Sequence, residues 1–298
     1  PGMIHKAMRI LFFCQYFPPE PGAPAARTHE HAREWVRRGH EVTVICGLPH
    51  YPEGVVTPPY QGRWLVDETI DGIRVLRCWL HIAPNRGAIR RSISFATFLC
   101  TATLTAIFRS GPCDVVAATS PQLFCGLAGW MIAAWKRKPF VFEVRDLWPR
   151  QIVDLGVITS RWIIAPLEKL EMFLYRHARA IVTVSPATSD DLAARGIARE
   201  KVPCIPNGID LNFFTPRSRH NALREKYGWG DDFIVLYIGA HGLSQGLEVI
   251  LNAADKLRAR KNIRFLFVGA GARKIELMGQ AAAQGLSNVQ FLPAVPKA

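Results

Sequence analysis

The residues best suited to chemistry follow predicted strands, at the points where the chain turns into a helix. One such junction is the run Val235-Leu-Tyr-Ile-Gly-Ala-His-Gly-Leu-Ser-Gln-Gly-Leu-Glu248, in which glycines join an apolar strand to a helical pattern. This arrangement directs backbone N–H groups and the positive end of a helix dipole toward one point. The sequence therefore predicts an anion site here, of the kind that usually holds a phosphate.

A second junction of the same kind lies in Phe265-Leu-Phe-Val-Gly-Ala-Gly-Ala-Arg-Lys274. A G-x-G turn often serves only tight packing. Parallel strands, however, end at the same edge of a sheet, so this turn and the loop from Gly239 to Gly246 are predicted to lie together. Arg273 and Lys274 could then neutralise a bound phosphate.

Charged residues also end a strand in the first half of the chain. In Phe140-Val-Phe-Glu-Val-Arg-Asp-Leu-Trp-Pro149, the residues Glu143, Arg145 and Asp146 interrupt and follow an apolar run. Burying these charges is costly unless they pair with one another or hold a ligand. Two interpretations therefore stand side by side, a ligand site and a structural Glu–Arg ion pair.

The loop after the first predicted strand reads Tyr16-Phe-Pro-Pro-Glu-Pro-Gly-Ala-Pro-Ala-Ala-Arg27. Ligands of doubly wound folds bind at this edge of the sheet. Gly22 and Ala23 would let a substrate approach the backbone, and Arg27 falls in the first helical turn; the alternative is a Pro-rich connector with a solvated Arg. The loop is not G-x-G-x-x-G, which argues against a dinucleotide cofactor.

The composition limits the classes of partner. The 298 residues leave room for two domains, and the net charge of +13 favours an anionic partner such as a phosphorylated substrate, phospholipid headgroups or nucleic acid. No recognisable nucleic-acid motif accompanies the charge, so we do not expect a nucleic-acid partner. We interpret the seven scattered cysteines as reduced core residues of a cytosolic protein, and we expect no metal site.

Strands alternate with helices along the first 210 residues, which predicts a parallel, doubly wound α/β sheet. The predicted strands are 9–14, 41–46, 73–78, 115–119, 140–144 and 181–185, and the predicted helices are 25–38, 88–109, 122–136, 160–178 and 188–195. The proline-rich region 47–72 is expected to be one long loop on the substrate side of the sheet.

The turn residues Pro206-Asn-Gly-Ile-Asp210 interrupt this alternation, and a new α/β unit starts at Phe233. We place the domain boundary at about 211, which gives domains of residues 1–210 and 211–298. The second is predicted to contain strands at 233–239, 263–268 and 288–292 and helices at 245–260 and 272–284. At about 30 residues per βαβ step, this second Rossmann-like domain is expected to be incomplete at Ala298 by about a hundred residues.

The longest apolar stretch, residues 93–108, is shorter than the ~20 residues that span a bilayer. Arg86, Arg90 and Arg91 precede it and Arg109 follows it, which makes a basic amphipathic segment. We weigh two interpretations, a helix packed on the sheet and a surface that also rests on anionic lipid. Residues 1–7 lack the apolar core of a signal peptide, and we expect the native start near Met8.

Taken together, the motifs resemble the retaining glycosyltransferases of family 4, which have the GT-B architecture of two Rossmann-like domains. The family's order is followed by Met8-Arg-Ile-Leu, F-P-P-E-P-G-A-P-A-A-R, R-R-G-H-E-V-T-V, E-V-R-D-L-W-P, V-S-P, P-N-G-I-D, the Y-I-G…G-L-S-Q-G-L-E loop and V-G-A-G-A-R-K. The chain most resembles the bacterial exopolysaccharide, capsule and O-antigen branch, and is similar to the fucosamine-transferase type. The resemblance covers the chain from Met8 onward.

This resemblance implies an N-terminal domain that binds an acceptor and a C-terminal domain that binds a nucleotide-sugar, with no cofactor and no catalytic metal. It places Asp146 near the transferred sugar, with Arg145 and Glu143 beside it as catalytic candidates, and Arg27 on the acceptor. The implied donor-binding residues are Gly22, Ala23, Gly239, His241, Gly242, Ser244, Gln245, Gly269, Gly271 and Lys274.

The expected reaction moves a sugar, with retention, to a lipid-linked or polysaccharide-precursor acceptor. We expect the protein to be cytoplasmic and peripheral at the inner face of the plasma membrane, with Arg86, Arg90 and Arg91 contacting anionic lipid.

Two departures from the family pattern bear on activity. Many members carry Arg and Lys in the diphosphate loop, where this chain has His241 and Gln245. The family's E-x7-E segment would fall beyond Ala298, so we expect the chain to be truncated, which leaves catalysis by it alone in question. The alternative function is a non-catalytic fragment that binds an acceptor or partner and needs a separate C-terminal half.

Overall fold

The computed structural model of the chain describes residues 6–51, 54–82, 88–209, 211 and 214–295. The chain forms two compact units, Pro1–Gly208 and Ile209–Ala298. Their boundary lies inside the turn sequence Pro206-Asn-Gly-Ile-Asp210, which the sequence analysis also identified as the break between domains. Each unit has its own sheet and its own core.

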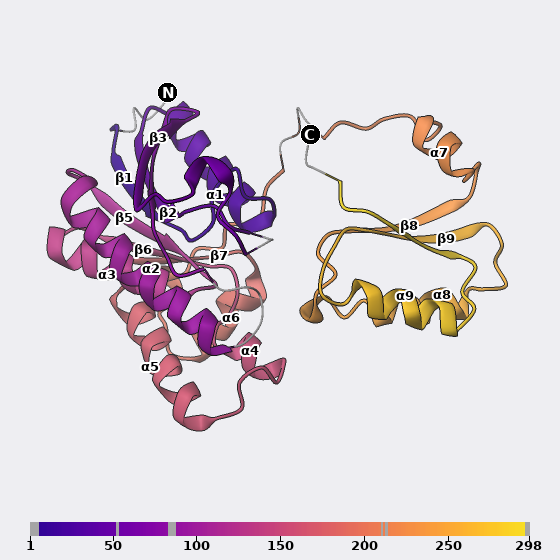
Figure 1. Cartoon of the computed structure of the whole chain (residues 1–298). Helices are drawn as coiled ribbons and strands as arrows, with labels where there is room; N and C mark the ends of the chain where they lie inside the picture. Colours follow the sequence, from indigo (N-terminus) through magenta and orange to yellow (C-terminus); the bar gives the residue numbers. More distant parts are fainter. Residues whose placement is uncertain (1–5, 52–53, 83–87, 210, 212–213, 296–298) are drawn as a thin grey trace. The chain divides into compact units, whose positions relative to one another are not determined.

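The first unit is built on a sheet whose described strands follow the order β3–β4–β2–β1–β5–β6–β7 (Figure 1). Every neighbouring pair is parallel except β3 with β4. The chain proceeds from β1 outward in both directions, so the connections diverge between β1 and β5. That point is where ligands bind in doubly wound sheets. The strands are β1 (Arg9–Phe13), β2 (Glu41–Gly47), β3 (Leu65–Ile70), β4 (Ile73–Cys78), β5 (Val115–Thr119), β6 (Phe140–Val144) and β7 (Ala180–Thr183).

Helices cover both faces of this sheet because the central strands are apolar on both sides. Leu11 and Phe13 of β1 face the core formed with α2, α3 and α5, and Ile10 and Phe12 face the core formed with α1. This alternation follows from the period of two in a strand. The helices are α1 (Ala23–Arg37), α2 (Ala88–Arg109), α3 (Leu123–Lys136), α4 (Arg150–Asp154), α5 (Arg161–His177) and α6 (Pro186–Ala194).

The prediction of one long loop over residues 47–72 was wrong. The segment contains β3, which pairs antiparallel with β4 as a hairpin. Its turn residues Asp71 and Gly72 have φ values of 50° and 78°. Asp-Gly is a preferred pair for such a turn, because both positions need positive φ. The alternating sequence Leu65–Ile70 directly before Asp-Gly was the signal that the analysis missed.

The second unit contains a parallel sheet in the order β10–β9–β8, with α8 and α9 packed on one face (Figure 1). Leu251 of α8 and Leu277 of α9 meet Phe265 and Phe267 of β9 in its core. The short helix α7 occupies a polar stretch to which the sequence analysis gave no element. The elements are α7 (Ala222–Tyr227), β8 (Phe233–Ile238), α8 (Glu248–Lys256), β9 (Ile263–Val268), α9 (Lys274–Ala283) and β10 (Val289–Leu292).

Gly126 of α3 packs tightly against the sheet and a neighbouring helix. A Cβ at this position would lie 2.7 Å from the ring of Phe142 and 3.1 Å from Leu174. Because overpacking moves neighbours off their preferred rotamers, we expect Gly126→Ala to lower the free energy of unfolding of the first unit by about 1–3 kcal/mol. Urea unfolding monitored by tryptophan fluorescence measures the change.

The control for this prediction is Gly279→Ala in α9, where an added Cβ meets nothing within 4 Å. The same replacement there should raise helix stability by about 0.5–1 kcal/mol. If Gly126→Ala stabilised the protein as Gly279→Ala is expected to, α3 could move away from the sheet without cost, which would contradict the prediction.

Candidate functional site

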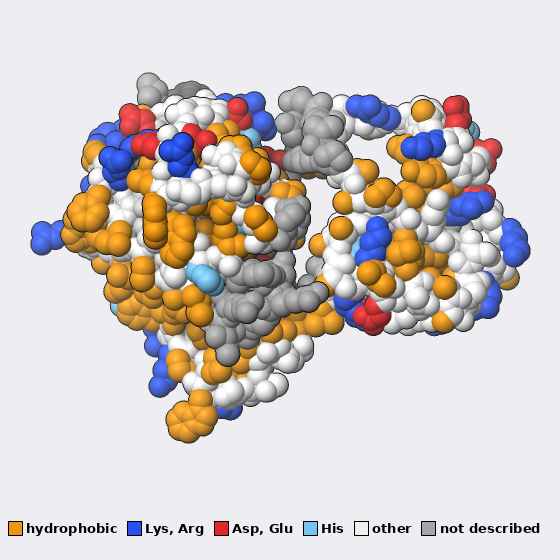
Figure 2. Space-filling model, in the orientation of Figure 1, with side chains coloured by type: hydrophobic (Ala, Val, Ile, Leu, Met, Phe, Trp, Pro, Cys, Tyr) orange, Lys and Arg blue, Asp and Glu red, His pale blue; other side chains and the backbone are white. Residues whose placement is uncertain are grey.

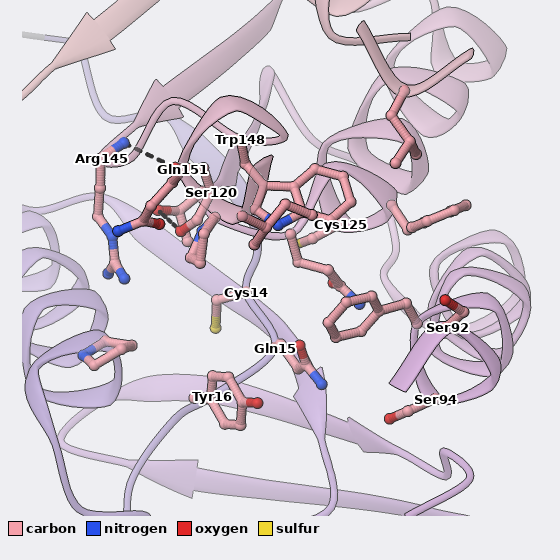
Figure 3. A pocket seen from close by; sticks show the side chains of 18 of the residues that line it. Cys14, Gln15, Tyr16, Ser92, Ser94, Ser120, Cys125, Arg145, Trp148 and Gln151 are labelled. Carbon is pink, nitrogen blue, oxygen red and sulfur yellow. Dashed lines mark hydrogen bonds between the residues drawn. The ribbon is translucent and has the colours of Figure 1, made fainter. Parts of the chain in front are cut away.

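A cavity of about 660 Å³ lies at the carboxyl ends of the central strands of the first unit (Figure 3). Residues that directly follow three strands line it: Cys14 and Gln15 after β1, Ser120 after β5, and Arg145 after β6. The topology therefore places the cavity where the connections diverge. Its size is within the usual range of small-molecule sites.

The cavity is lined by both polar and apolar side chains. Arg145 and Ser120 lie across the cavity from Ser92 and Ser94 of α2 in Figure 3. The segment from α4 into α5 adds an apolar wall, formed by Trp148, Ile152, Val157, Ile158, Ile163 and Leu167. A cavity with this mixed lining suits a ligand that has both charged or hydroxyl groups and an apolar part.

Glu143 lies at the end of β6 and is bound by a buried cation. Arg27 of α1 donates from Nε and Nη2 to Glu143 Oε1 at 3.0 and 2.7 Å, and Thr119 Oγ1 donates to Oε2 at 2.6 Å. Both charged side chains are only 10% exposed. The geometry favours the ion-pair interpretation of Glu143. The partner is Arg27 rather than the adjacent Arg145.

Arg27 also reaches the end of the first unit, since its Nη1 donates to Asn207 Oδ1 in the P-N-G turn. His31 of α1 lies 3.7 Å from Glu143, and burial lowers the pKa of this imidazole. One carboxylate thus connects α1, β5 and β6, and its arginine partner extends the connection to the chain that leads out of the unit.

Arg145 presents a positive charge to the cavity. Its backbone N–H and that of Asp146 donate to Ser120 Oγ at 2.8 and 3.3 Å, which fixes the loop after β6 to the loop after β5. Burial lowers the pKa of the Arg145 guanidinium, and the charge of Arg27 acts in the same direction. An anion bound in the cavity would therefore stabilise the charged form of the Arg145 guanidinium. Asp146 and Glu143 are not among the described residues that line it.

Sequence reasoning missed Glu20, whose buried carboxylate holds together two loops that border the cavity. Its carboxylate accepts backbone N–H groups of His50 and Tyr51 at 3.0 Å each and of Phe17 at 3.3 Å. Burial raises the pKa of this carboxyl, while the three hydrogen bonds oppose the rise. Glu20 ties the loop after β1 to the loop after β2. A single acid among prolines was its only signal in the sequence.

Gly22 and Ala23 stand at the start of α1. Gly22 has a φ of 109°, a conformation that L side chains rarely adopt, and Ala23 is the first helical residue. Neither is among the described residues that line the cavity, whereas Pro24 and Thr28 of the same helix are. The glycine is therefore required by the backbone conformation itself.

In the second unit, the two glycine-rich loops pack directly on each other. A Cβ on Gly269 would overlap the carbonyl oxygen of Gly239, and a Cβ on Gly271 would overlap the carbonyl oxygen of His241. His241 N–H donates to Ala270 O at 2.9 Å, and Arg273 N–H donates to His241 O at 3.0 Å. The predicted proximity of the two loops is confirmed, and the glycines serve their mutual contact.

The side chain of His241 is enclosed under these loops. It is 0% exposed, and its ring lies 5.8 Å from that of Tyr237 and 6.2 Å from those of Phe267 and Phe291. Neither ring nitrogen has a hydrogen-bond partner in the described part of the chain. Burial, with a contribution from Lys274, lowers the pKa of this histidine. The imidazole is therefore neutral near pH 7.

The remaining donor candidates lie around the same loops. Lys274 Nζ donates to the carbonyl oxygens of Gly269 and Leu292, both at 2.7 Å, which leaves one of its three N–H groups for a ligand. Gln245 Oε1 accepts the N–H of Gly242 at 3.1 Å and shapes the short turn that carries the exposed Ser244. Arg273, in contrast, forms ion pairs with Glu248 and Glu276.

The structure describes the three predicted membrane-contact residues only in part. Arg86 lies outside the described residues, and Arg90 and Arg91 lie in α2 without described side chains. Across the described ranges, no three His, Cys, Asp or Glu side chains gather in a way that could hold a metal ion.

Comparison with known families matches both units. Residues 22–208 match the glycosyl transferase 4-like domain, and residues 220–298 match the glycosyl transferases group 1 family. The chain is 28% identical to a protein of Escherichia coli K12 named as a colanic acid biosynthesis glycosyl transferase, WcaI, over 96% of this chain and 72% of that protein. It is 27% identical to a GDP-mannose-dependent alpha-mannosyltransferase of Mycolicibacterium smegmatis, over 91% of this chain and 65% of that protein.

Solved structures share the fold, which is that of GT-B glycosyltransferases with two Rossmann-like domains. Anabaena Alr3699/HepE in complex with UDP-glucose matches with a TM-score of 0.64 at 19% identity, over 97% of this chain and 69% of that one. WaaG, a glycosyltransferase involved in lipopolysaccharide biosynthesis, matches with a TM-score of 0.61 at 16% identity, over 96% and 70% of the two chains.

Removing Glu143 should leave Arg27 as a buried, unpaired cation. We expect Glu143→Ala to lower the free energy of unfolding of the first unit by about 3–5 kcal/mol, measured by chemical denaturation. The control is Glu34→Ala, which removes the partner of the largely exposed Arg38 and should change stability little. If both replacements had equally small effects, Glu143 would not hold the unit together.

His241 should make the second unit sensitive to acid. Its pKa is lower in the folded state than the ordinary value of 6.5, so below about pH 6.5 the unfolded chain binds a proton that the folded chain does not. Stability should therefore fall as the pH drops through this range. We expect His241→Leu to remove that dependence and to preserve or raise stability at pH 7.5, because it eliminates unpaired buried nitrogens. Thermal unfolding of wild type and variant between pH 7.5 and pH 5 tests this, and a variant as acid-sensitive as the wild type would contradict it.

Proposed function

Because this chain belongs to the glycosyltransferases with a glycosyl transferase 4-like domain, we propose that it moves a sugar from a nucleotide-sugar to a lipid-linked or polysaccharide-precursor acceptor. We include retention of the anomeric configuration in the proposal, on the basis of the order of motifs from Met8 onward. The proposed location is the inner face of the plasma membrane, with peripheral contact to anionic lipid.

The second unit is the proposed donor site. Its two glycine-rich loops follow β8 and β9 and meet through His241, and Lys274 holds an ammonium group beside them. Backbone N–H groups and a lysine at this edge can stabilise the charge that develops on a leaving diphosphate, without a metal. The Mycolicibacterium relative is named for its dependence on GDP-mannose, and the Anabaena structure holds UDP-glucose. Both support a nucleotide-sugar as the donor.

The cavity of the first unit is the proposed acceptor site. A lipid-linked saccharide has hydroxyl groups, a phosphate and an apolar chain, and the cavity offers both Arg145 and Ser120 and an apolar wall from the α4–α5 segment. Arg145 would bind the phosphate. Arg27 and Glu143 would act as positioning residues, because each neutralises the charge of the other. Asp146, fixed through Ser120, would lie near the transferred sugar.

The observation that carries this proposal is the contact between the two glycine-rich loops beside Lys274. Ligand-detected NMR with UDP-, GDP- and dTDP-sugars should show binding of one nucleotide class. We expect Lys274→Met to weaken that binding about tenfold to a hundredfold, because a charge-assisted hydrogen bond to phosphate contributes about 1.5–3 kcal/mol. The matched control is Lys256→Met, at an exposed position near the end of α8.

Failure of all three nucleotide classes to bind to the folded protein would contradict the donor site. Unchanged binding by Lys274→Met would exclude Lys274 from it. The lipid arm of the proposal has a separate test, in which Arg86, Arg90 and Arg91 are replaced by Glu and binding to anionic vesicles is measured.

A further inference from the structure

The outward face of α2 is unusual for a helix on the surface of a protein. Ile93, Leu104 and Phe108 are 45%, 54% and 76% exposed, so the solvent side of the helix is apolar. Among the described residues, α2 is the one helix long and apolar enough to cross a membrane, with a mean hydropathy of 1.3 over Ser92–Arg109, of which 33% is buried. Surface helices ordinarily place charged and polar side chains on this side.

The inward face of α2 shows that the helix belongs to the folded unit and does not span a bilayer. Phe98, Ala102 and Ala106 are 0% exposed and lie in the core with α3 and the sheet. Apolar residues on the outward face therefore contribute nothing to the core. An exposed apolar area of this kind marks a surface that contacts another molecule or a membrane.

The neighbouring end of α3 continues this surface. Lys136 Nζ donates to Gly111 O at 2.6 Å, which places the end of α3 against the end of α2. Met131 and Trp135 of α3 are 39% and 57% exposed, and the Lys136 ammonium lies 5.2 Å from the centre of the Trp135 ring. Figure 2 shows hydrophobic side chains gathered over this side of the first unit, where Figure 1 draws α2. We call Ile93, Leu104, Phe108, Met131 and Trp135 the α2–α3 surface.

The charged residues that α2, α3 and the chain between and just after them contribute are almost all positive. Residues 88–138 contain a single acid, Asp114, and it is paired with Arg9. The basic residues of the same span are Arg90, Arg91, Arg109, Lys136, Arg137 and Lys138. Exposed aromatic and aliphatic side chains beside a cluster of Lys and Arg are the combination that binds the headgroup region of an anionic bilayer.

We propose that the α2–α3 surface docks the first unit on an anionic phospholipid bilayer, with α2 lying along the membrane. Phe95 and Ser94 in the early turns of α2 line the cavity, so this orientation holds the cavity beside the lipid surface. The inference deepens the proposed function and rests on it for its purpose, the delivery of a lipid-linked acceptor. Vesicle binding itself requires neither donor nor acceptor.

Co-sedimentation with vesicles tests the proposal. Wild type should bind vesicles of phosphatidylcholine with phosphatidylglycerol and bind pure phosphatidylcholine vesicles much more weakly. The apolar variant is Phe108→Ser with Trp135→Ser. The charge variant replaces Lys136, Arg137 and Lys138 by Gln. We expect the charge variant to lose about a hundredfold in partitioning at low salt, because each of the three basic residues near the surface contributes about fivefold. We expect the apolar variant to lose at least about tenfold.

The matched control is Trp64→Ser with Ile275→Ser, which removes an aromatic and an aliphatic side chain that are 71% and 85% exposed elsewhere. It should sediment like wild type. Near-UV circular dichroism and nucleotide-sugar NMR on every variant establish that the fold and donor site persist, so a loss of vesicle binding is separable from a failure of the proposed transfer.

Three results would overturn the proposal. The first is wild type that stays in the supernatant with anionic vesicles while still binding a nucleotide-sugar, and the second is a control that loses as much vesicle binding as the apolar variant. Size-exclusion chromatography gives the third: if wild type is a dimer and the apolar variant a monomer with unchanged vesicle binding, the α2–α3 surface joins two copies of this chain.

Discussion

The carboxylate of Glu143 is the group on which the arrangement of the first unit depends. It is almost inaccessible to water, and it is stable there because Arg27 supplies two N–H donors and Thr119 a third. A charge buried at the end of a strand must be compensated, so β6, β5 and α1 are held at fixed positions around it. Residues in or directly after these three elements form part of the cavity lining, and Arg145, two residues beyond Glu143, is directed to the cavity by the same strand end. The ion pair thus determines where an anion could be bound, without binding one itself.

In the second unit, close backbone packing rather than an ion pair fixes the position of two loops. Its two loops approach so closely that Gly269 and Gly271 have no room for a Cβ. The contact buries the imidazole of His241, and neither ring nitrogen finds a partner among the residues that the structure describes. An unpaired buried imidazole lowers stability, and an apolar residue of similar size would fill the same space. Retaining a costly group at the centre of two loops that face a proposed diphosphate site is what selection for function, rather than for stability, would produce.

The sequence predicted the architecture well because its signals are local. Apolar runs, helix periodicity and glycine junctions identified all strands of the first sheet except β3, and identified both glycine-rich loops. The site was harder to predict because its contacts are remote. Arg27 and Glu143 are 116 positions apart, so the choice between an ion pair and a ligand site required knowledge of which segments meet. Glu20 was missed for the same reason, since its partners Tyr51 and His50 belong to another loop.

The distribution of apolar and basic side chains adds a constraint that neither unit's internal contacts explain. A soluble helix packed on a sheet needs one apolar face, and α2 already satisfies this with Phe98, Ala102 and Ala106. Its second apolar face therefore lowers solubility without stabilising the fold, unless something covers it. Because α2 and α3 contain basic residues and no acids, their positive charge repels other basic proteins and attracts anionic lipid. The cavity is lined by the same helix, so one element would carry both the membrane contact and part of the acceptor site, which links access to a lipid-linked substrate to the orientation of the whole unit.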